Sequence, residues 1–163
     1  MDSKEMDAQA AHEATYSALM TALAGTNIIY GPGMIDFGIT VDYGQLLFSN
    51  DIIKMVRRGL QGIDVNRETL AVDIIDKVGP AGNFIFEEHT MTHMRTEQAQ
   101  PNLIDRRMRY AWKADGSKNL TARAKEKARE ILANYQPTPV KEDIRQKVEE
   151  IVKEAEAELL PQK

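Results

Sequence analysis

The sequence predicts a helix-rich α/β fold, and three observations support that prediction. Apolar residues recur at three- or four-residue spacing through most of the chain, which is typical of amphipathic helices. Short β-branched and aromatic runs at residues 26–30 and 83–86 are typical of buried strands, and a glycine-rich loop follows the first run. A complete (β/α)8 barrel takes about 200–250 residues. A chain of 163 residues therefore cannot close such a barrel by itself.

The composition argues against several classes of protein. Lys and Arg number 21 against 25 Asp and Glu, and the net charge of −4 argues against a surface that binds nucleic-acid phosphates. Because there is no cysteine, disulfides, cysteine-ligated metals and thiol nucleophiles are excluded, and we expect a cytoplasmic location. The first residues lack the basic and apolar regions of a signal peptide. No apolar run approaches the roughly 20 residues of a membrane helix.

The first expected helix covers residues 7–23. Asp7 is a suitable N-cap, because its carboxylate can accept hydrogen bonds from the free amides of the first turn. Gly25 ends the helix by taking the left-handed conformation that other residues resist. Apolar and small residues repeat every four positions along one face, at Ala11, Thr15, Leu19 and Leu23.

A strand is expected at residues 26–30. Glycine and proline interrupt residues 31–38 too often for either regular element, so we expect a loop there. A second helix is expected from about Tyr43, with its cap near Ser49 or Asn50. Its apolar face consists of Ile52, Met55, Val56 and Leu60.

Asn66 is a suitable cap for a third helix, which Gly79 and Pro80 end because proline cannot continue the hydrogen-bond ladder. Its apolar residues again fall four positions apart, at Leu70, Ile74 and Val78. Residues 83–86 then form the second expected strand.

The last third of the chain is expected to be mostly helical. Helices are expected over residues 106–112 and 120–133. A final helix is expected with Thr138 as its cap and Pro139 at its first position, where the missing N–H costs nothing. Opposite a face of Lys and Glu, this helix carries Ile144, Val148, Ile151, Val152, Ala155 and Leu159.

Two of the three histidines, His89 and His93, are spaced so that their rings lie one above the other on a helix. This spacing occurs in zinc-binding helices. The His-Glu-x-x-His pattern is absent, however, and no third ligand is evident. We therefore expect no metal site, and interpret the pair as polar residues at the mouth of a cleft or on the surface.

His12 lies one position away from the apolar face of the first expected helix, close to Gln9. A histidine at such an edge is most often a boundary residue with satisfied hydrogen bonds. The alternative hypothesis is that His12 and Gln9 line a polar pocket at the first turns of the helix. Both interpretations remain open from the sequence.

Two further motifs have ordinary structural explanations. Gly31 and Gly33 follow the first expected strand, where α/β proteins bind ligands, but glycine serves a plain tight turn equally well. The spacing matches neither the Rossmann nor the P-loop motif, so a nucleotide site is not expected. Asp105, Arg106, Arg107 and Arg109 could hold a phosphate, although structural ion pairs are favoured in so acidic a chain.

The order and spacing of many segments resemble the trimethylamine methyltransferase family, which includes glycine betaine methyltransferases. The resemblance extends over nearly the whole chain. The segments that carry it are Asp2-Ser3-Lys4, Asp7-Ala8-Gln9-Ala10-Ala11-His12-Glu13, Leu23-Ala24-Gly25, Ile29-Tyr30-Gly31-Pro32-Gly33-Met34, Gly62-Ile63-Asp64-Val65, Glu68-Thr69-Leu70-Ala71, Lys77-Val78-Gly79-Pro80, His89-Thr90, His93-Met94-Arg95-Thr96-Glu97, Asp105-Arg106-Arg107 and Trp112.

This resemblance implies that the chain is the C-terminal portion of a TIM (β/α)8 barrel that is incomplete here. Residues 1–98 would hold the last βα units, with strands seven and eight at residues 26–30 and 83–86, and residues 99–163 a helical extension. The residues implied to face the substrate or the corrinoid are His12, Gln9, Tyr30, Gly31, Gly33, His89 and His93.

The implied activity moves a methyl group from trimethylamine, glycine betaine or a similar amine to the cobalt of a corrinoid. That corrinoid is carried by a separate partner protein, so no cofactor is expected to bind this chain directly. The family's pyrrolysine, where present, would fall just before Met1, so no catalytic residue is expected within the chain. Three explanations of this start at Met1 stay open. The chain starts after an in-frame amber codon, it was trimmed, or it is a betaine-type member cut at an internal methionine.

Two functional hypotheses follow. In the first, the chain is a fragment of such a methyltransferase, inactive alone, whose severed strand edges favour homo-oligomers. In the second, it is a non-catalytic helical binding or scaffold protein that docks a corrinoid protein or another partner.

Overall fold

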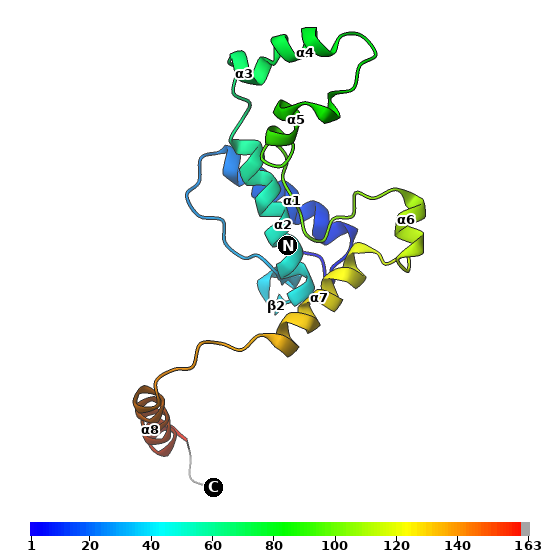
Figure 1. Ribbon diagram of the computed structural model, residues 1–163. Helices are drawn as coiled ribbons and strands as arrows, with labels where there is room; N and C mark the ends of the chain where they lie inside the picture. The colour runs from blue at the N-terminus through cyan, green and yellow to red at the C-terminus, as the bar shows by residue number, and fades with distance from the viewer. Residues whose placement is uncertain (161–163) are drawn as a thin grey trace. The chain divides into compact units, whose positions relative to one another are not determined.

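A computed structural model describes residues 1–160, and helices make up most of it (Figure 1). The chain divides into two compact units, Met1–Ile131 and Leu132–Lys163, and each is described by itself. The boundary predicted between residues 98 and 99 separates the last βα units of the full-length barrel from the helical extension, and it stays a prediction. Among the described helices, none combines the length and apolar character that a membrane span requires.

Helix α1 spans Ala8–Leu23 and confirms the first predicted helix. Asp7 is its N-cap, because the backbone N–H of Ala10 donates to the Asp7 carboxylate at 2.9 Å. The Ser3 hydroxyl donates to the same carboxylate oxygen, and these hydrogen bonds lower the pKa of Asp7. Beyond the helix, Gly25 takes a left-handed φ of +79°, as predicted.

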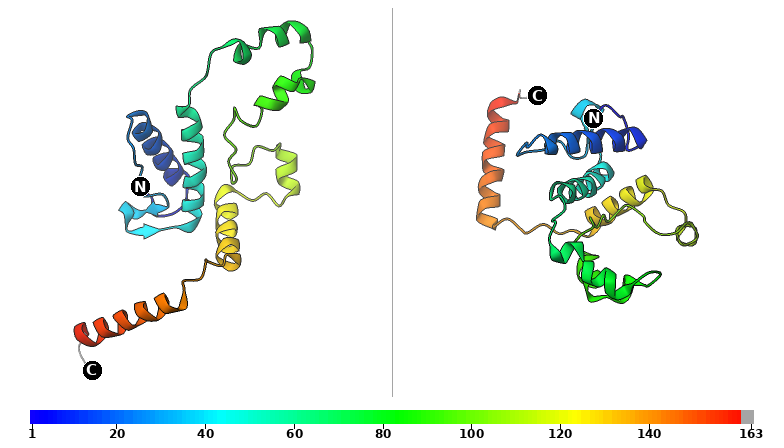
Figure 2. Two further views of the ribbon diagram at one scale, coloured as in Figure 1. Left: turned by 60° about the vertical axis from the view of Figure 1, so that its left-hand side comes forward. Right: turned by 90° about the horizontal axis from the view of Figure 1, so that it is seen from above.

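Helix α2 spans Tyr43–Leu60 and packs against α1 (Figure 2). The predicted start near Tyr43 is confirmed, but the predicted cap at Ser49 or Asn50 is wrong. Asp42 caps the helix, since its carboxylate accepts from the Gln45 amide at 2.7 Å. Ser49 instead lies within the helix and is buried, because α2 extends about one and a half turns further toward its N-terminus than the predicted cap.

The core of the first unit forms where α1 and α2 meet the segments before α1 and after residue 102. Ala124 of α7, which spans Leu120–Asn134, belongs to this core, and Leu120 packs against it. This helix confirms the prediction for residues 120–133. The buried cluster consists of Met6, Ala18, Phe48, Ile52, Val56, Leu103 and Ala124.

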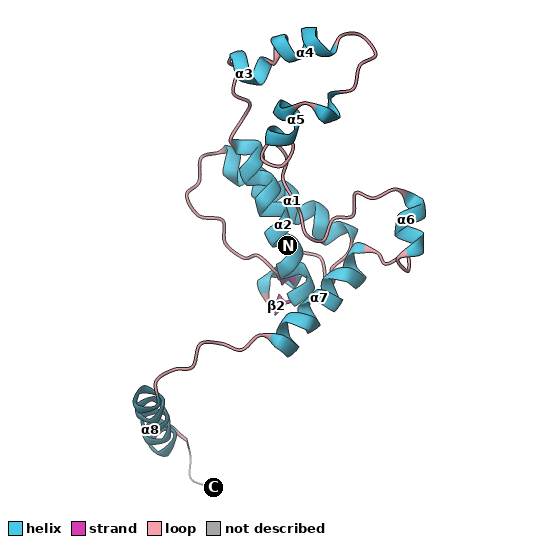
Figure 3. Cartoon of the chain, in the orientation of Figure 1, coloured by secondary structure: helices cyan, strands magenta, loops and turns pink. Residues whose placement is uncertain are grey.

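The described residues contain two strands, but not the predicted ones (Figure 3). Strands β1 (Met34–Ile35) and β2 (Thr40–Val41) form an antiparallel hairpin around the 3-10 turn η1 (Asp36–Gly38). This hairpin lies mainly in the segment predicted as a loop. The strand predicted at residues 26–30 is not formed, because a strand needs a neighbour for its backbone hydrogen bonds and none of the described residues supplies one.

The second predicted strand, at residues 83–86, is also wrong. Phe84–Phe86 form a 3-10 turn, η2. The Asn83 side chain accepts from the Ile85 amide at 3.0 Å, so a local side-chain bond takes the donor that a sheet ladder would use. The structure is therefore a helix-rich α/β arrangement with two short antiparallel strands within residues 1–160.

The third predicted helix is divided into α3 (Arg67–Leu70) and α4 (Val72–Val78). Asn66 caps α3 as predicted, and its side chain accepts from the Thr69 amide at 3.0 Å. Ala71 separates the two helices because its φ of +50° is left-handed. Gly79 follows α4 as predicted.

The remaining short helices are α5 (Glu88–His93) and α6 (Arg109–Ala114). The sequence predicted that the second of these would begin at residue 106. It begins three residues later, because Asp105 accepts from both the backbone and the guanidinium of Arg107 and so holds this segment outside the helix.

In the second unit, α8 spans Glu142–Leu159 and confirms the final predicted helix. Its predicted start is wrong. Lys141 occupies the N-cap position, so Thr138 is not the cap and Pro139 precedes the first turn. The extended segment that contains the two prolines is longer than expected, since the residue before a proline disfavours helical geometry.

Candidate functional site

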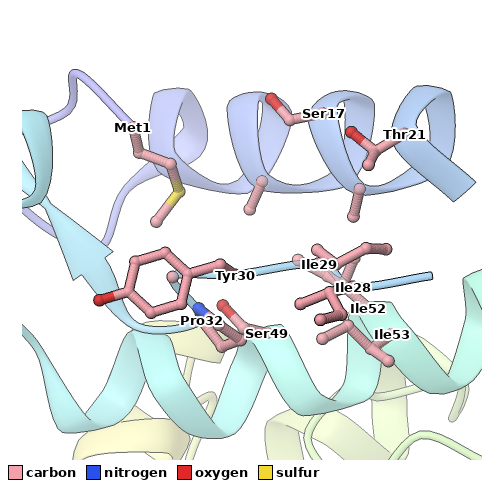
Figure 4. A pocket seen from close by; sticks show the side chains of 13 residues that line it. Met1, Ser17, Thr21, Ile28, Ile29, Tyr30, Pro32, Ser49, Ile52 and Ile53 are labelled. Carbon is pink, nitrogen blue, oxygen red and sulfur yellow. The ribbon is translucent and has the colours of Figure 1, made fainter. Parts of the chain in front are cut away.

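A cavity of about 210 Å³ lies between α1, α2 and the extended segment that connects α1 to the hairpin (Figure 4). Both helices and the connecting segment contribute side chains to its wall, together with the first residue of the chain. The thirteen lining residues are Met1, Ala14, Ser17, Ala18, Thr21, Ile28, Ile29, Tyr30, Gly31, Pro32, Ser49, Ile52 and Ile53.

The cavity has an aromatic end and an aliphatic end. Met1 and Tyr30 lie at one end, and Ile29 and Ile52 are among the four isoleucines at the other (Figure 4). The polar groups of the wall include the Ser49 hydroxyl, and no lining side chain carries a charge. The cavity is therefore suited chemically to a small ligand with exposed methyl groups.

The Ser49 side chain is held in place by α2 and by the loop that precedes β1. Its oxygen accepts from the Gln45 side-chain amide at 3.3 Å and from the Gly33 backbone N–H at 3.4 Å. Gln45 is fully buried, and its carbonyl oxygen has no hydrogen-bond partner among the described residues. These contacts fix the α2 wall of the cavity.

Glycine is required at position 33 for close approach of the loop to α2. Its φ is +81°, and a Cβ there would lie 2.8 Å from the Cβ of Leu46. Gly31 also has a left-handed φ, +90°, and lines the cavity. The tight-turn interpretation of this loop is thus confirmed, and a ligand role for both glycines stays a prediction.

Backbone hydrogen bonds hold the start of the chain beside the cavity. The Phe37 N–H donates to the Met1 carbonyl at 2.9 Å, and the Asp36 N–H donates to the Ser3 carbonyl at 2.8 Å. The Glu13 carboxylate accepts from the Asp2 amide at 2.7 Å. Met1 is therefore placed at the cavity by the turn between β1 and β2, a contact that the sequence did not predict.

His12 and Gln9 lie on the exposed surface of α1 and outside the cavity wall. The His12 ring stacks on Tyr16 with a centroid distance of 6.1 Å. The Gln9 side-chain amide donates to the Glu13 carboxylate at 2.7 Å, and this bond is the main cause of the lowered pKa of Glu13. The functional role predicted for His12 and Gln9 stays a prediction.

His89 and His93 are brought together on α5, with ring centroids 4.3 Å apart. Both contact Glu68 of α3: His89 Nε2 lies 2.8 Å from its carbonyl oxygen, and His93 Nε2 lies 3.2 Å from its carboxylate. They line a separate cleft of about 600 Å³ with Arg58, Gly62 and other residues. Within residues 1–160, no cluster of three or more metal-ligating side chains is suited to hold a metal ion.

The basic cluster near residue 107 forms structural ion pairs, as favoured from the sequence. Arg107 lies 2.8 Å from the carboxylates of both Asp105 and Asp115. The Arg107 side chain is the main cause that lowers the pKa of Asp105 to about 2. The same contacts raise the pKa of Arg107.

Comparison with known proteins identifies the family. A family model described as "Trimethylamine methyltransferase (MTTB)" matches residues 1–159. This chain belongs to the trimethylamine methyltransferase family. The resemblance seen in the sequence is therefore confirmed over nearly the whole chain.

Individual relatives agree with this assignment. The chain is 52% identical over 158 residues to a trimethylamine methyltransferase of Desulfitobacterium hafniense. The aligned region covers 97% of this chain and 32% of that relative. It is 48% identical over 155 residues to one of Methanosarcina mazei (95% and 31%). A glycine betaine methyltransferase of D. hafniense is 29% identical over 152 residues (93% and 32%). The chain spans about a third of the length of these relatives.

The family resemblance implied that Tyr30, Gly31 and Gly33 face the substrate or the corrinoid. Tyr30 and Gly31 line the cavity and Gly33 does not, and the role of these residues stays a prediction. Met1, Ser49 and Ile52 were not assigned to a site, because an apolar or capping residue has the same sequence signal whether it packs in a core or lines a cavity. No local pattern could have found them.

Proposed function

We propose that this chain is the C-terminal portion of a methyltransferase that moves a methyl group from trimethylamine, glycine betaine or a similar amine to the cobalt of a corrinoid on a separate protein. The observation that carries the proposal is the 52% identity to a trimethylamine methyltransferase over 97% of the chain. Since the chain spans about a third of that relative, the proposal concerns the full-length protein.

The cavity beside Met1 and Tyr30 supports this proposal as a binding site for the amine. The quaternary ammonium of glycine betaine has no N–H to donate and protonated trimethylamine has only one, so both are recognised mainly by aromatic faces and apolar walls. Tyr30 offers such a face, and the isoleucines offer a wall for methyl groups. Pockets for drug-sized ligands are about 300–1,000 Å³. A cavity of about 210 Å³ thus suits a small amine but not a corrin macrocycle, which fits the proposal that the partner protein carries the corrinoid.

In the proposed reaction the methyl carbon leaves the amine nitrogen, which keeps the electron pair, and bonds to the reduced cobalt of the partner's corrinoid. The protein's main contribution to such a transfer is to hold the methyl group in line with its acceptor. Met1 and Ser3 are held by the hairpin turn, and Ser49 is held by Gln45 and Gly33. We propose that these contacts position the amine and that the family's pyrrolysine, where present, precedes Met1.

We also propose that the full-length protein is a (β/α)8 barrel in the cytoplasm. Ile28 and Tyr30 are 76% and 85% exposed, although both are large and apolar or aromatic. Isoleucine is among the residues most often buried in folded proteins, and tyrosine is commonly buried in part. In the proposed barrel, the remainder of the protein covers them and brings His12, Gln9, His89 and His93 toward the corrinoid.

The test uses the full-length protein that contains these residues, with its corrinoid protein and either trimethylamine or glycine betaine. Corrinoid absorbance reports methyl transfer. Tyr30→Leu is expected to lower kcat/KM about tenfold through loss of the cation–π contact, whereas Tyr30→Phe retains it. Tyr135→Leu, at an exposed tyrosine in the second unit, is the matched control and should have no effect.

Two outcomes would contradict this proposal. Absence of methyl transfer from every methylated amine, with the corrinoid protein still bound, would favour the non-catalytic binding protein. An unchanged kcat/KM in Tyr30→Leu would show that the cavity does not bind the amine. His12→Ala should also lower methyl transfer, and normal activity of that variant would contradict the role predicted for His12.

A further inference from the structure

Helix α8 presents an apolar face that the second unit leaves uncovered. It has 18 residues, none of which is buried, and it is uninterrupted (Figure 2). Ile151 is 64% exposed and Leu159 is 77% exposed. Helices in proteins depend on packing of their apolar face for most of their stability. We therefore expect another apolar surface to pack on this face, and the arrangement of its residues indicates which surface.

The apolar face is symmetric about its own midpoint. A twofold rotation about an axis between Ile151 and Val152 reverses the direction of the helix. This rotation brings each apolar residue of the face to the position of another apolar residue of the face. The exchanged pairs are Ile144 with Leu159, Val148 with Ala155, and Ile151 with Val152. An antiparallel second copy of the same helix would thus cover the whole face, in the self-complementary manner of a twofold interface.

The charges beside the apolar face can be compared with the same antiparallel arrangement. By helical periodicity, Lys147, Glu154 and Glu158 lie along one edge, and Arg145, Glu149 and Glu156 lie along the other. In an antiparallel twofold pair each edge meets the same edge of the second copy. Lys147 then lies between Glu154 and Glu158 of the second copy.

On the second edge Arg145 lies beside Glu156 of the second copy, whereas Glu149 lies on the other side of that Glu156, so the first edge contributes most of the charge complementarity. A parallel pair would instead bring opposite edges together and place Glu154 and Glu158 beside Glu156. Like charges at such positions repel. Charge therefore selects the antiparallel arrangement.

We propose that α8 is a homodimerisation element, in which two copies of this chain pair antiparallel about a twofold axis between residues 151 and 152. Existing contacts do not compete strongly with this pairing. Arg145 reaches Glu142 at 2.9 Å within its own helix, but both side chains are about 60% exposed. Such surface pairs contribute little and exchange readily. The proposal stands independently of the proposed function.

Cysteine cross-linking tests the geometry in the full chain, which has no native cysteine. Val148→Cys and Ala155→Cys are made in separate copies, which are mixed and oxidised. Because a disulfide requires Cα atoms within about 7 Å, the mixture should give at least about tenfold more linked dimer than either variant alone. Ala157→Cys, on the opposite side of α8, is the control and should remain unlinked.

Charge reversal tests the same contact without a covalent bond. Lys147→Glu should raise the dimer Kd about tenfold, since it opposes acidic residues of the second copy. Adding Glu154→Lys and Glu158→Lys to this variant should restore dimerisation, measured by sedimentation. Fluorescence of the single tryptophan, Trp112, checks that the first unit remains folded.

Three results would overturn the proposal. The first is a wild-type chain that stays monomeric, together with a mixture of the two cysteine variants that gives no linked dimer. This result is expected if α8 packs on another part of its own chain. The second is efficient cross-linking of Val148→Cys with itself, which indicates a parallel pair. The third is a dimer that persists in Ile151→Asp, which would place the interface elsewhere.

Discussion

Gly33 illustrates how much a single residue can control in this chain. Its backbone is left-handed, and a side chain would meet Leu46 at both the Cβ, 2.8 Å away, and the Cα, 3.0 Å away. A glycine here lets the loop that lines the cavity lie directly on α2. The sequence indicated a turn at this glycine, whereas the contact with α2 became visible only in the structure.

Gly33→Ala is expected to destabilise the protein by about 2–4 kcal/mol, because it combines backbone strain with overpacking against α2. Gly25→Ala is the matched control, since its φ is +79° but nothing lies within 4 Å of the added Cβ. It should cost only the conformational term of about 1–2 kcal/mol. Denaturant unfolding measures the free energy of unfolding of both variants. Equal losses of stability would show that Leu46 and the loop move apart and relieve the contact.

The Asp105–Arg107 pair should make stability depend on acidic pH. Since the pKa of Asp105 is lowered to about 2 from 3.8, the folded state holds this carboxylate ionised more readily than the unfolded state. The resulting stabilisation is present above about pH 4 and is lost as the pH falls toward 2. Arg107→Gln should remove that stabilisation at neutral pH.

Thermal unfolding between pH 2 and 7 checks this prediction. The difference between wild type and Arg107→Gln should shrink as the pH falls through this window. Arg106→Gln, at an exposed neighbouring arginine, serves as the control and should give a difference that is independent of pH. A constant difference for Arg107→Gln would contradict the assignment.

At the scale of elements, the start of α2 depends on Asp42. This carboxylate accepts from the Gln45 amide, whereas Asn50, a cap expected from the sequence, lies exposed within the helix. The sequence predicted helical periodicity from about Tyr43 but assigned the cap to Ser49 or Asn50, because the apolar face was drawn only from Ile52 onward; Leu46, Leu47 and Phe48 also lie on this helix. The first turns carry polar residues, such as Gln45, that tertiary contacts bury.

Asp42→Ala should cost about 1 kcal/mol of stability through loss of the cap. Asn50→Ala is the control, and it should be neutral or slightly stabilising because alanine has the higher helix propensity. Chemical denaturation of both variants measures the difference. If Asn50→Ala were the more damaging change, the cap of α2 would lie where the sequence placed it.

At the scale of the whole molecule, Asp51 connects α2 to a segment 52 residues away. It is fully buried, and its carboxylate accepts from the Leu103 amide at 2.7 Å. Arg123 of α7 donates to the Leu103 carbonyl at 3.0 Å. Leu103 is thus held from both sides, and this contact links α2, residue 103 and α7 within the first unit.

Asp51→Ala is expected to destabilise the first unit by about 2 kcal/mol, since it leaves the buried Leu103 amide unpaired. Asp73→Ala, which removes an exposed carboxylate paired with Arg67, should change stability by less than about 0.5 kcal/mol. Urea unfolding followed by Trp112 fluorescence distinguishes the two. Similar small effects would mean that the segment near Leu103 is held by other contacts.

The sequence by itself determined the features that depend on neighbouring residues. Helical periodicity located α1, α7 and α8, local capping chemistry identified Asp7 and Asn66, and the spacing of the two histidines on α5 predicted their contact. These predictions succeeded because a helix forms its hydrogen bonds within one segment. The family resemblance was likewise carried by residues in order along the chain.

Only the tertiary structure decided the strands and the cavity. Residues 26–30 have the composition of a strand, but a strand forms only beside a partner, and β1 instead pairs with β2. The cavity joins Met1, residues 28–32 and α2, which no sequence spacing connects. Side-chain type expresses a local preference, whereas pairing and enclosure depend on which distant segments meet, and that is a property of the folded chain alone.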